Sequence, residues 1–201
     1  RPEALEPLLI LKKEFSGWDR SSERPDLLAL DPSRRLVVIE LKLDDSGKDT
    51  VWQALKYAAY GSTLKTGQII DLLHSTRGGT REAATEAIAE FVGVETSDAL
   101  ALNPSNTQRI LLVAANFRPE VTATALSLRD HGLDIACHQV TPFRRADDLF
   151  LNVEQIIPIP EARDYMVSVA EKRSEEGSAS RAEGARHARR RAYWKELLED
   201  F

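Results

Sequence analysis

The apolar positions in the first forty residues follow the patterns of β-strands. The opening "EPLLILKKEF" is rich in aliphatic side chains and runs into a polar loop around Gly17, which is typical of a strand and its end. Two further apolar runs, "PDLLALD" and "RLVVIELKL", flank "DPSRR", whose Pro and Ser are typical of a tight turn. The pattern therefore predicts one strand followed by a β-hairpin.

The spacing of the apolar residues changes to a helical period after the hairpin. A helix is expected from about Asp49 to Leu64, with Leu55 and Ala58 on one stripe and Asp49 or Thr50 as its cap. Two shorter helices are expected next, the first ending at "RGG" and the second lying between a Thr cap and a Gly stop, over about Thr66–His74 and Thr80–Gly93.

The second half of the chain alternates strand and helix patterns. "RILLVAA" is typical of a buried strand, "RPEVTATALSLRDHG" of a helix closed by Gly132, and "LDIACHQVT" and "LFLNVEQIIPIP" of further strands. The strand, helix, strand order over residues 109–141 predicts a crossover unit beside the hairpin. We therefore expect an α/β or α+β fold with a mixed sheet.

The length and the local composition predict one principal domain with an appendage. At 201 residues the chain is long enough for a sizeable core, which we expect over residues 1–160. Residues 161–201 include "SEEGSASRAEGARHARRR", a polar and charge-dense stretch that is typical of a linker or an exposed helix. We expect this helical tail to lead to a further C-terminal domain.

Composition narrows the functional classes. Hydrophobic residues make up 42% and charged residues 29%, which is ordinary for a soluble globular protein, and the net charge of −5 excludes a global basic signature. Nucleic-acid binding would therefore need a local patch or metal ions. With no apolar run of about 20 residues and no signal-peptide pattern, a cytoplasmic protein without membrane contact is expected. Cys137, the single cysteine, is predicted to be a buried, reduced thiol.

The hairpin carries three charged residues at positions where a strand pattern predicts apolar ones. Residues two apart in a strand share a face, so Glu40 and Lys42 are neighbours. If the turn is a three-residue loop over 32–34, Asp31 pairs with Arg35 and Asp26 comes to lie opposite Glu40. A two-residue turn would shift the pairing by one position and separate the two carboxylates.

Two carboxylates opposed across a sheet are destabilising unless a cation neutralises them. Mg²⁺ prefers oxygen ligands and retains several waters, so Asp26, Glu40 and the carbonyl of Leu41 form a plausible half-site. Lys42 on the same face would then orient or deprotonate a water molecule and stabilise charge on a phosphate. The alternative is that Glu40 and Lys42 form a structural ion pair at a strand end. For Trp52, near this site, packing is favoured over base stacking.

The same residues carry a resemblance to a known family. "PD" at Asp26 followed by "ELK" at Glu40–Lys42 is similar to the active-site signature of the PD-(D/E)xK nuclease superfamily, and "QALKY" resembles the Q-x-x-x-Y helix of its RecB-like members. Gln53 and Tyr57 lie one turn apart on this helix. The sequence of residues 1 to about 165 looks most like the NucS-like branch. It also looks like a group of little-studied bacterial proteins in which a further domain follows the nuclease domain.

This resemblance implies a restriction-endonuclease-like core with a C-terminal βαββ extension and a helical tail. It implies a Mg²⁺-dependent DNA endonuclease of repair or defence, with Mn²⁺ able to substitute. Asp26 and Glu40 would be metal ligands, Lys42 the catalytic lysine, and Gln53 with Tyr57 a supporting pair. Many relatives cut as homodimers, so a homodimer is among the partners that the resemblance admits.

Two other classes of function stay open. The superfamily usually has a helix with another acidic residue before its first strand, whereas this sequence opens at that strand, so a non-catalytic DNA-binding or protein-docking module is the alternative. A scaffold with structural charges is the third hypothesis. Finally, "STRGGT" at residues 75–80 lacks the lysine of a Walker motif, so a helix connection is favoured, with a contact to a DNA backbone left open.

Overall fold

The computed structural model describes residues 6–15, 24–45, 47, 49–95, 100–105 and 107–159. The expected loop at Gly17 and the expected tail over 161–201 lie outside these residues. The elements described are, in chain order, β1 (Leu9–Lys13), β2 (Leu27–Leu30), β3 (Leu36–Asp45), α1 (Thr50–Gly61), α2 (Thr66–Arg77), α3 (Arg81–Phe91), β4 (Arg109–Asn116), α4 (Pro119–Asp130), β5 (Asp134–Arg145) and β6 (Asp148–Ile157).

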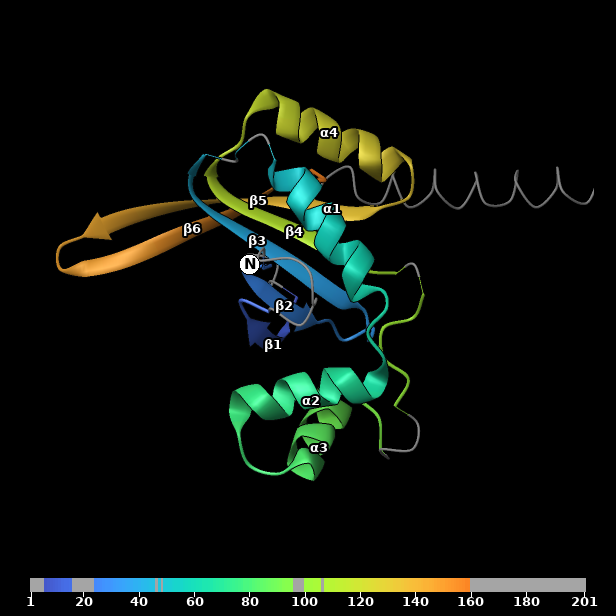
Figure 1. The fold of residues 1–201 in the computed structure, drawn as a ribbon. Coiled ribbons are helices and arrows are strands. Elements are labelled where there is room, and N and C mark those ends of the chain that lie inside the picture. Colours follow the sequence, from blue (N-terminus) through green and yellow to red (C-terminus); the bar gives the residue numbers. More distant parts are fainter. Residues whose placement is uncertain are drawn as a thin grey trace, which may run out of the picture. The chain divides into compact units, whose positions relative to one another are not determined.

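The six strands form one mixed sheet in the order β1-β2-β3-β4-β5-β6 (Figure 1). The first three strands and the last two pair antiparallel, whereas β3, β4 and β5 pair in parallel. The predicted hairpin is β2–β3, and the predicted crossover unit is β4-α4-β5. The expectation of an α+β fold with a mixed sheet is therefore confirmed; the finer prediction of a restriction-endonuclease-like core stays a prediction.

Burial along β3 explains its central place and locates the end of the core. Its first four residues, Leu36 to Ile39, are buried on both faces, as a continuous apolar run predicts for a strand flanked by two others. Further along, Leu41 is 44% exposed and Leu43 is 95% exposed. Glu40 therefore lies at the boundary where β3 leaves the core.

The helices form two groups around the sheet. Helices α1 and α4 cover one face, with α1 against β3 and β4 and with α4 against β5 (Figure 1). Helices α2 and α3 pack against each other, and α2 lies against the edge strand β1. The Thr76 hydroxyl of α2 donates a 2.7 Å hydrogen bond to the Leu11 carbonyl of β1, which attaches this helix to the sheet edge.

The helix ends follow the predicted signals with one exception. Thr80 caps α3 through its hydroxyl, which accepts from the Ala83 amide at 3.1 Å, and α2 stops at Gly78, whose φ of 73° suits a residue without a side chain. The predicted cap at Asp49 is wrong in its chemistry. Asp49 occupies the N-cap position just before α1 but has helical backbone angles rather than the extended ones of a capping residue, and its side chain accepts no capping bond.

Two further expectations concern Cys137 and the membrane. The Cys137 side chain is fully buried in β5, and burial raises the pKa of its thiol to about 12, which agrees with the predicted inert thiol. Within the described ranges, none of the helices has the length and the apolar character that crossing a membrane requires.

Candidate functional site

The hairpin turn sets the register that brings two carboxylates together. The Asp31 amide donates to the Arg35 carbonyl at 3.0 Å, which closes a three-residue loop whose last residue, Arg34, has a φ of 67°. Residues 27 and 39 pair directly across the two strands. One position further along, Asp26 therefore lies opposite Glu40, and the predicted register is confirmed.

A backbone amide of β3 holds the Asp26 carboxylate in place. Asp26 Oδ2 accepts a hydrogen bond of 2.7 Å from the Leu41 amide. In a strand the N–H and C=O of one residue point to the same edge, so the Leu41 carbonyl also faces the side where β2 has ended. Asp26 and the Leu41 carbonyl, two of the three predicted metal ligands, thus lie at one edge of β3.

Glu40 is a buried acid whose polar contacts are incomplete. Its side chain is 3% exposed, its Oε2 lies 3.6 Å from Lys42 Nζ, and its Oε1 has no hydrogen-bond donor among the described residues. The pKa of Glu40 is raised to about 7, first by burial and then by the charge of Asp26 and a side-chain hydrogen bond with Asp26, whereas Lys42 lowers it. The folded protein therefore encloses an acid that water does not solvate and that no described donor fully neutralises.

Helix α1 supplies the other side of the site. Gln53 Oε1 accepts a 3.3 Å hydrogen bond from Lys42 Nζ, which lies between this amide and Glu40. One turn later, Tyr57 is 2% exposed, and its pKa is raised by burial and then by the negative charges of Glu40 and Asp26. The five residues predicted to form the site thus come together from the residue before β2, from β3 and from α1.

The donor set fits a hard divalent cation. Two carboxylates and one carbonyl offer the oxygen ligands that Mg²⁺ prefers, and the enclosed Glu40 Oε1 has the lone pairs of an unused ligand. The residues that the structure describes contain no group of three or more acidic, His or Cys side chains suited to a metal. Asp26, Glu40 and Leu41 would therefore leave part of the coordination to water and phosphate, as is usual for Mg²⁺.

The prediction that Trp52 serves for packing rather than for base stacking is not supported by its position. Trp52 immediately precedes Gln53 on α1, and its side chain is 67% exposed. A step of 100° per residue along the helix carries it from the buried side of Val51 to the outer side. The helical stripe that identified Leu55 and Ala58 could have identified this outward position.

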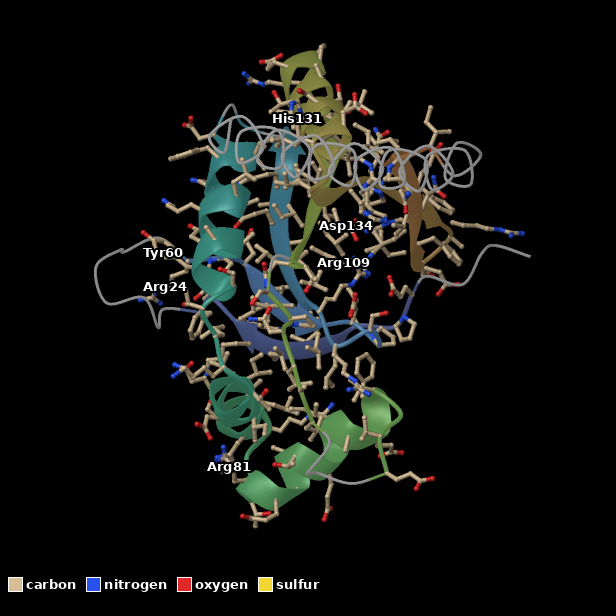
Figure 2. The ribbon with its side chains drawn as sticks, turned by 90° about the vertical axis from the view of Figure 1, so that its right-hand side faces the viewer. Arg24, Tyr60, Arg81, Arg109, His131 and Asp134 are labelled. Atoms are coloured by element: carbon tan, nitrogen blue, oxygen red, sulfur yellow. The ribbon has the colours of Figure 1, made fainter. Side chains whose placement is uncertain are left out.

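A second cluster of charges, at the opposite end of the hairpin, was not recognised as a unit. Asp31 is fully buried and contacts Arg35 and Arg109. Arg35 also contacts Asp134, and so does Arg109, whose label lies beside that of Asp134 in Figure 2. The predicted pairing of Asp31 with Arg35 was the only signal of this cluster, because Arg109 and Asp134 come from strands about 75 to 100 residues further along the chain.

Comparison of the chain with models of known protein families, with curated proteins and with solved structures found no match in any of the three.

Proposed function

We propose that the protein is a Mg²⁺-dependent nuclease that hydrolyses DNA phosphodiester bonds, with Mn²⁺ able to replace Mg²⁺. One observation carries the proposal: Glu40 is buried with an oxygen that has no donor among the described residues, and it faces Asp26 on one side and Lys42 on the other. An uncompensated buried acid destabilises a fold by several kcal/mol, so its presence beside a lysine in an open strand end favours a ligand site.

Each residue of the site would have a separate role in hydrolysis. Asp26, Glu40 and the Leu41 carbonyl would hold the cation, whose bound form supplies Lewis-acid activation of water and neutralises charge on the phosphate. The Leu41 amide orients Asp26, and burial keeps Glu40 in one position. Hydrolysis forms a bond from a water oxygen to phosphorus and breaks one P–O ester bond, with the leaving oxygen taking up a proton.

Lys42 is suited to act on the reacting phosphate. Its ammonium group is held between Glu40 Oε2 at 3.6 Å and Gln53 Oε1 at 3.3 Å, so it has a defined direction without being buried. A positive charge fixed at this point stabilises the extra negative charge that develops on the phosphate during attack. Gln53 positions the lysine, and Tyr57 lies in the core that contains Val38, near enough to Glu40 and Asp26 for their charges to raise its pKa.

The experiment is a cleavage assay on a labelled DNA mixture of single strands, duplexes and flaps, with Mg²⁺ or Mn²⁺. Glu40→Gln and Lys42→Ala are expected to lower the rate by at least about 10²-fold, because the first removes a charged ligand of the cation and the second removes the positive charge that faces the reacting phosphate. Glu86→Gln is the matched control, since Glu86 is exposed on α3. Cleavage that survives in both site variants would overturn the proposal.

The alternative of a non-catalytic module gives a different result in the same assay. Wild-type protein would then bind DNA, or another protein, without cleaving any substrate in either metal. Binding without cleavage that is also indifferent to Asp26 and Glu40 would identify these charges as structural.

A further inference from the structure

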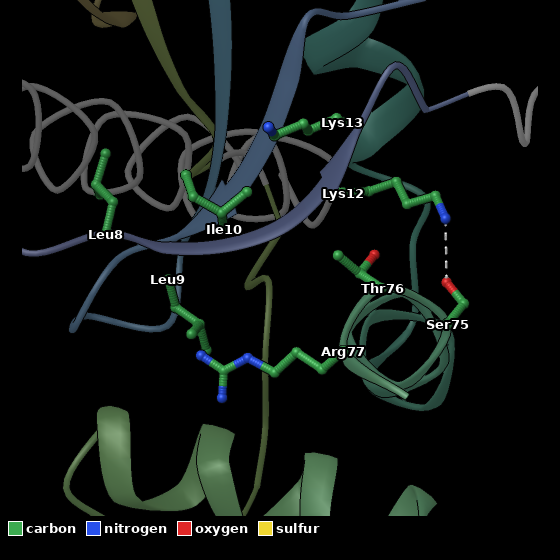
Figure 3. A pocket seen from close by; sticks show the side chains of 8 residues that line it. All are labelled: Leu8, Leu9, Ile10, Lys12, Lys13, Ser75, Thr76 and Arg77. Atoms are coloured by element: carbon green, nitrogen blue, oxygen red, sulfur yellow. Dashed lines mark hydrogen bonds between the residues drawn. The ribbon is translucent and has the colours of Figure 1, made fainter. Parts of the chain in front are cut away.

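A groove lined by cations lies between the edge strand β1 and the last turn of α2. Its volume is about 560 Å³, and Figure 3 shows the side chains around it. Three of the eight lining residues are cationic and none is acidic, although the whole chain has a net charge of −5. The lining residues are Leu8, Leu9, Ile10, Lys12, Lys13, Ser75, Thr76 and Arg77.

Hydrogen bonds between β1 and α2 make the groove a defined structure. Thr76 binds the Leu11 carbonyl at 2.7 Å, and Lys12 Nζ lies 3.4 Å from the Ser75 hydroxyl (Figure 3). Arg77 ends the helix and extends toward Leu9 in the same view. The groove therefore has hydroxyl and cationic groups along the helix side and a strand backbone along the other.

The cationic side chains of the groove form no ion pairs with acidic side chains among the described residues. Within the described residues, none of Lys12, Lys13 and Arg77 forms an ion pair with a carboxylate, whereas the exposed Arg81 of α3 pairs with Asp71 at 2.7 Å. Unpaired cations with hydroxyl groups beside them match the donors that bind phosphate oxygens of a nucleic-acid backbone.

The groove and the candidate site lie on neighbouring strands of the same sheet. Lys12 pairs with Leu28 and Lys13 with Leu27, and the next backbone contact is the Glu14 amide to the Asp26 carbonyl at 3.0 Å. Lys12 shares a face with Leu28 and therefore with Asp26, two residues earlier, whereas Lys13, paired with Leu27, lies on the opposite face of β1. Two strand spacings and one two-residue step separate the Cα positions of Lys12 and Glu40, which is about 12 Å, or about three to four base-pair steps along a duplex axis at 3.4 Å each.

We propose that this groove binds the phosphodiester backbone of the DNA that the site cleaves, about 12 Å from the scissile phosphate. This inference rests on the proposed nuclease function and adds the surface that guides its substrate. An acidic peptide added as a seventh strand fits less well, because the Leu11 carbonyl on this edge is already bound by Thr76 and lysines on an edge oppose strand addition. The residues of "STRGGT" that precede its glycines are thus part of the binding surface.

The test measures DNA affinity without metal, so that it does not depend on catalysis. Fluorescence anisotropy with a labelled 20-nucleotide single strand and the matching duplex, in EDTA at several salt concentrations, compares wild type with Lys12→Gln/Arg77→Gln. Lys12 is half-buried and Arg77 is exposed, so the fold is expected to persist, and the melting temperature checks this. Lys65→Gln/Arg81→Gln is the matched control, since it removes one lysine and one arginine at the other end of α2 and on α3.

The groove variant is expected to bind at least about 10-fold more weakly, with the slope of log K against log salt reduced by about 1.4 for the single strand or about 1.8 for the duplex. The control is expected to keep both values near those of wild type. Equal affinity and slope in the two double variants would overturn the inference, and so would a loss confined to an acidic peptide probe.

The outcome of this affinity test can be distinguished from the outcome of the cleavage assay that tests the proposed function. Groove-dependent DNA binding in a protein that cleaves nothing would support the groove and overturn the nuclease. Cleavage that depends on Glu40, together with an unchanged salt slope in the groove variant, would support the nuclease and overturn the groove.

Discussion

Two buried acids on one hairpin, Asp31 and Glu40, have opposite surroundings. Asp31 is 0% exposed and Glu40 is 2% exposed, so burial alone does not separate them. Asp31 Oδ1 accepts from the Arg35 amide at 2.8 Å, and its Oδ2 accepts from Arg35 Nε at 2.8 Å and from Arg109 Nη1 at 3.0 Å. Every oxygen of Asp31 is satisfied, and two cations neutralise it.

Glu40 has one cation at 3.6 Å, an enclosed oxygen without a described donor, and a second acid, Asp26, opposite it. A buried charge with complete partners contributes to the architecture, whereas one with incomplete partners is prepared for a ligand that completes them. The comparison teaches that the number of donors around a buried acid, rather than its burial, distinguishes a structural residue from a candidate catalytic one.

The largest expected effect on stability comes from removing the satisfied acid. Asp31→Ala removes the fully buried carboxylate that Arg35 and Arg109 share and leaves them the partly exposed Asp134, and breaking a buried pair costs about 3–5 kcal/mol. Urea denaturation at pH 7 measures the difference in the free energy of unfolding. A loss below about 1 kcal/mol would show that Asp31 is no more structural than Glu40.

The second-largest expected effect is a pH dependence of the free energy of unfolding that is caused by Glu40. Its folded pKa is raised from 4.5 to about 7, so between these values the folded state holds a proton that the unfolded state has lost. In metal-free buffer, the free energy of unfolding is therefore expected to fall as pH rises from about 4.5 through 7, by up to about 3 kcal/mol.

Glu40→Gln is the matched variant for this pH dependence. It keeps the shape of the side chain and removes the titration, so its stability curve should be flatter over the same window and should lie above the wild-type curve at pH 8. Identical slopes in the two proteins would show that Glu40 titrates near its ordinary pKa and that its surroundings are complete.

The third effect is stabilisation by a divalent cation. At a Mg²⁺ or Mn²⁺ concentration 100 times the Kd, binding to the folded state alone adds about 2.7 kcal/mol to the free energy of unfolding. Asp26→Asn keeps an acceptor for the Leu41 amide and removes the charge, so this variant is expected to lose the stabilisation while the exposed control Glu86→Gln retains it. Calorimetric titration of Mn²⁺ into the three proteins measures the same difference directly.

The smallest effect concerns an ion pair that is as short as those of Asp31. Arg81 Nε lies 2.7 Å from Asp71 Oδ1, but the two side chains are 48% and 60% exposed. Because water screens an exposed pair, Asp71→Asn is expected to change the free energy of unfolding by less than about 1 kcal/mol. A loss comparable to that of Asp31→Ala would mean that distance, and not burial, sets the strength of these contacts.

Most of the elements could be predicted from local patterns. The hairpin, its three-residue loop, the cap at Thr80 and the stop at Gly78 depend on residues within a few positions of one another, so periodicity and turn chemistry are sufficient. The error at Asp49 has the same local origin: a residue type that favours a cap adopts helical backbone angles, and its side chain then makes no capping bond.

The candidate site was predicted as far as the hairpin register and the helix spacing allow. The opposition of Asp26 and Glu40 follows from the loop length, and Gln53 and Tyr57 share a helix face by their spacing of four. What the spacing could not predict is that Lys42 is held between Glu40 and Gln53, or that Glu40 Oε1 is left without a described donor. These contacts depend on how α1 packs across β3.

The sequence by itself determined the order of the strands and helices, the turn that aligns the two carboxylates, and the residue types at the candidate site. Only the tertiary structure decided which buried acid is satisfied, because the arginine that completes Asp31 comes from β4, 78 residues away. It also decided that Lys12 and Arg77 line one groove, since β1 and α2 are adjacent only after folding. Periodicity reports the face on which a side chain lies, whereas its partners depend on packing between segments that are distant along the chain.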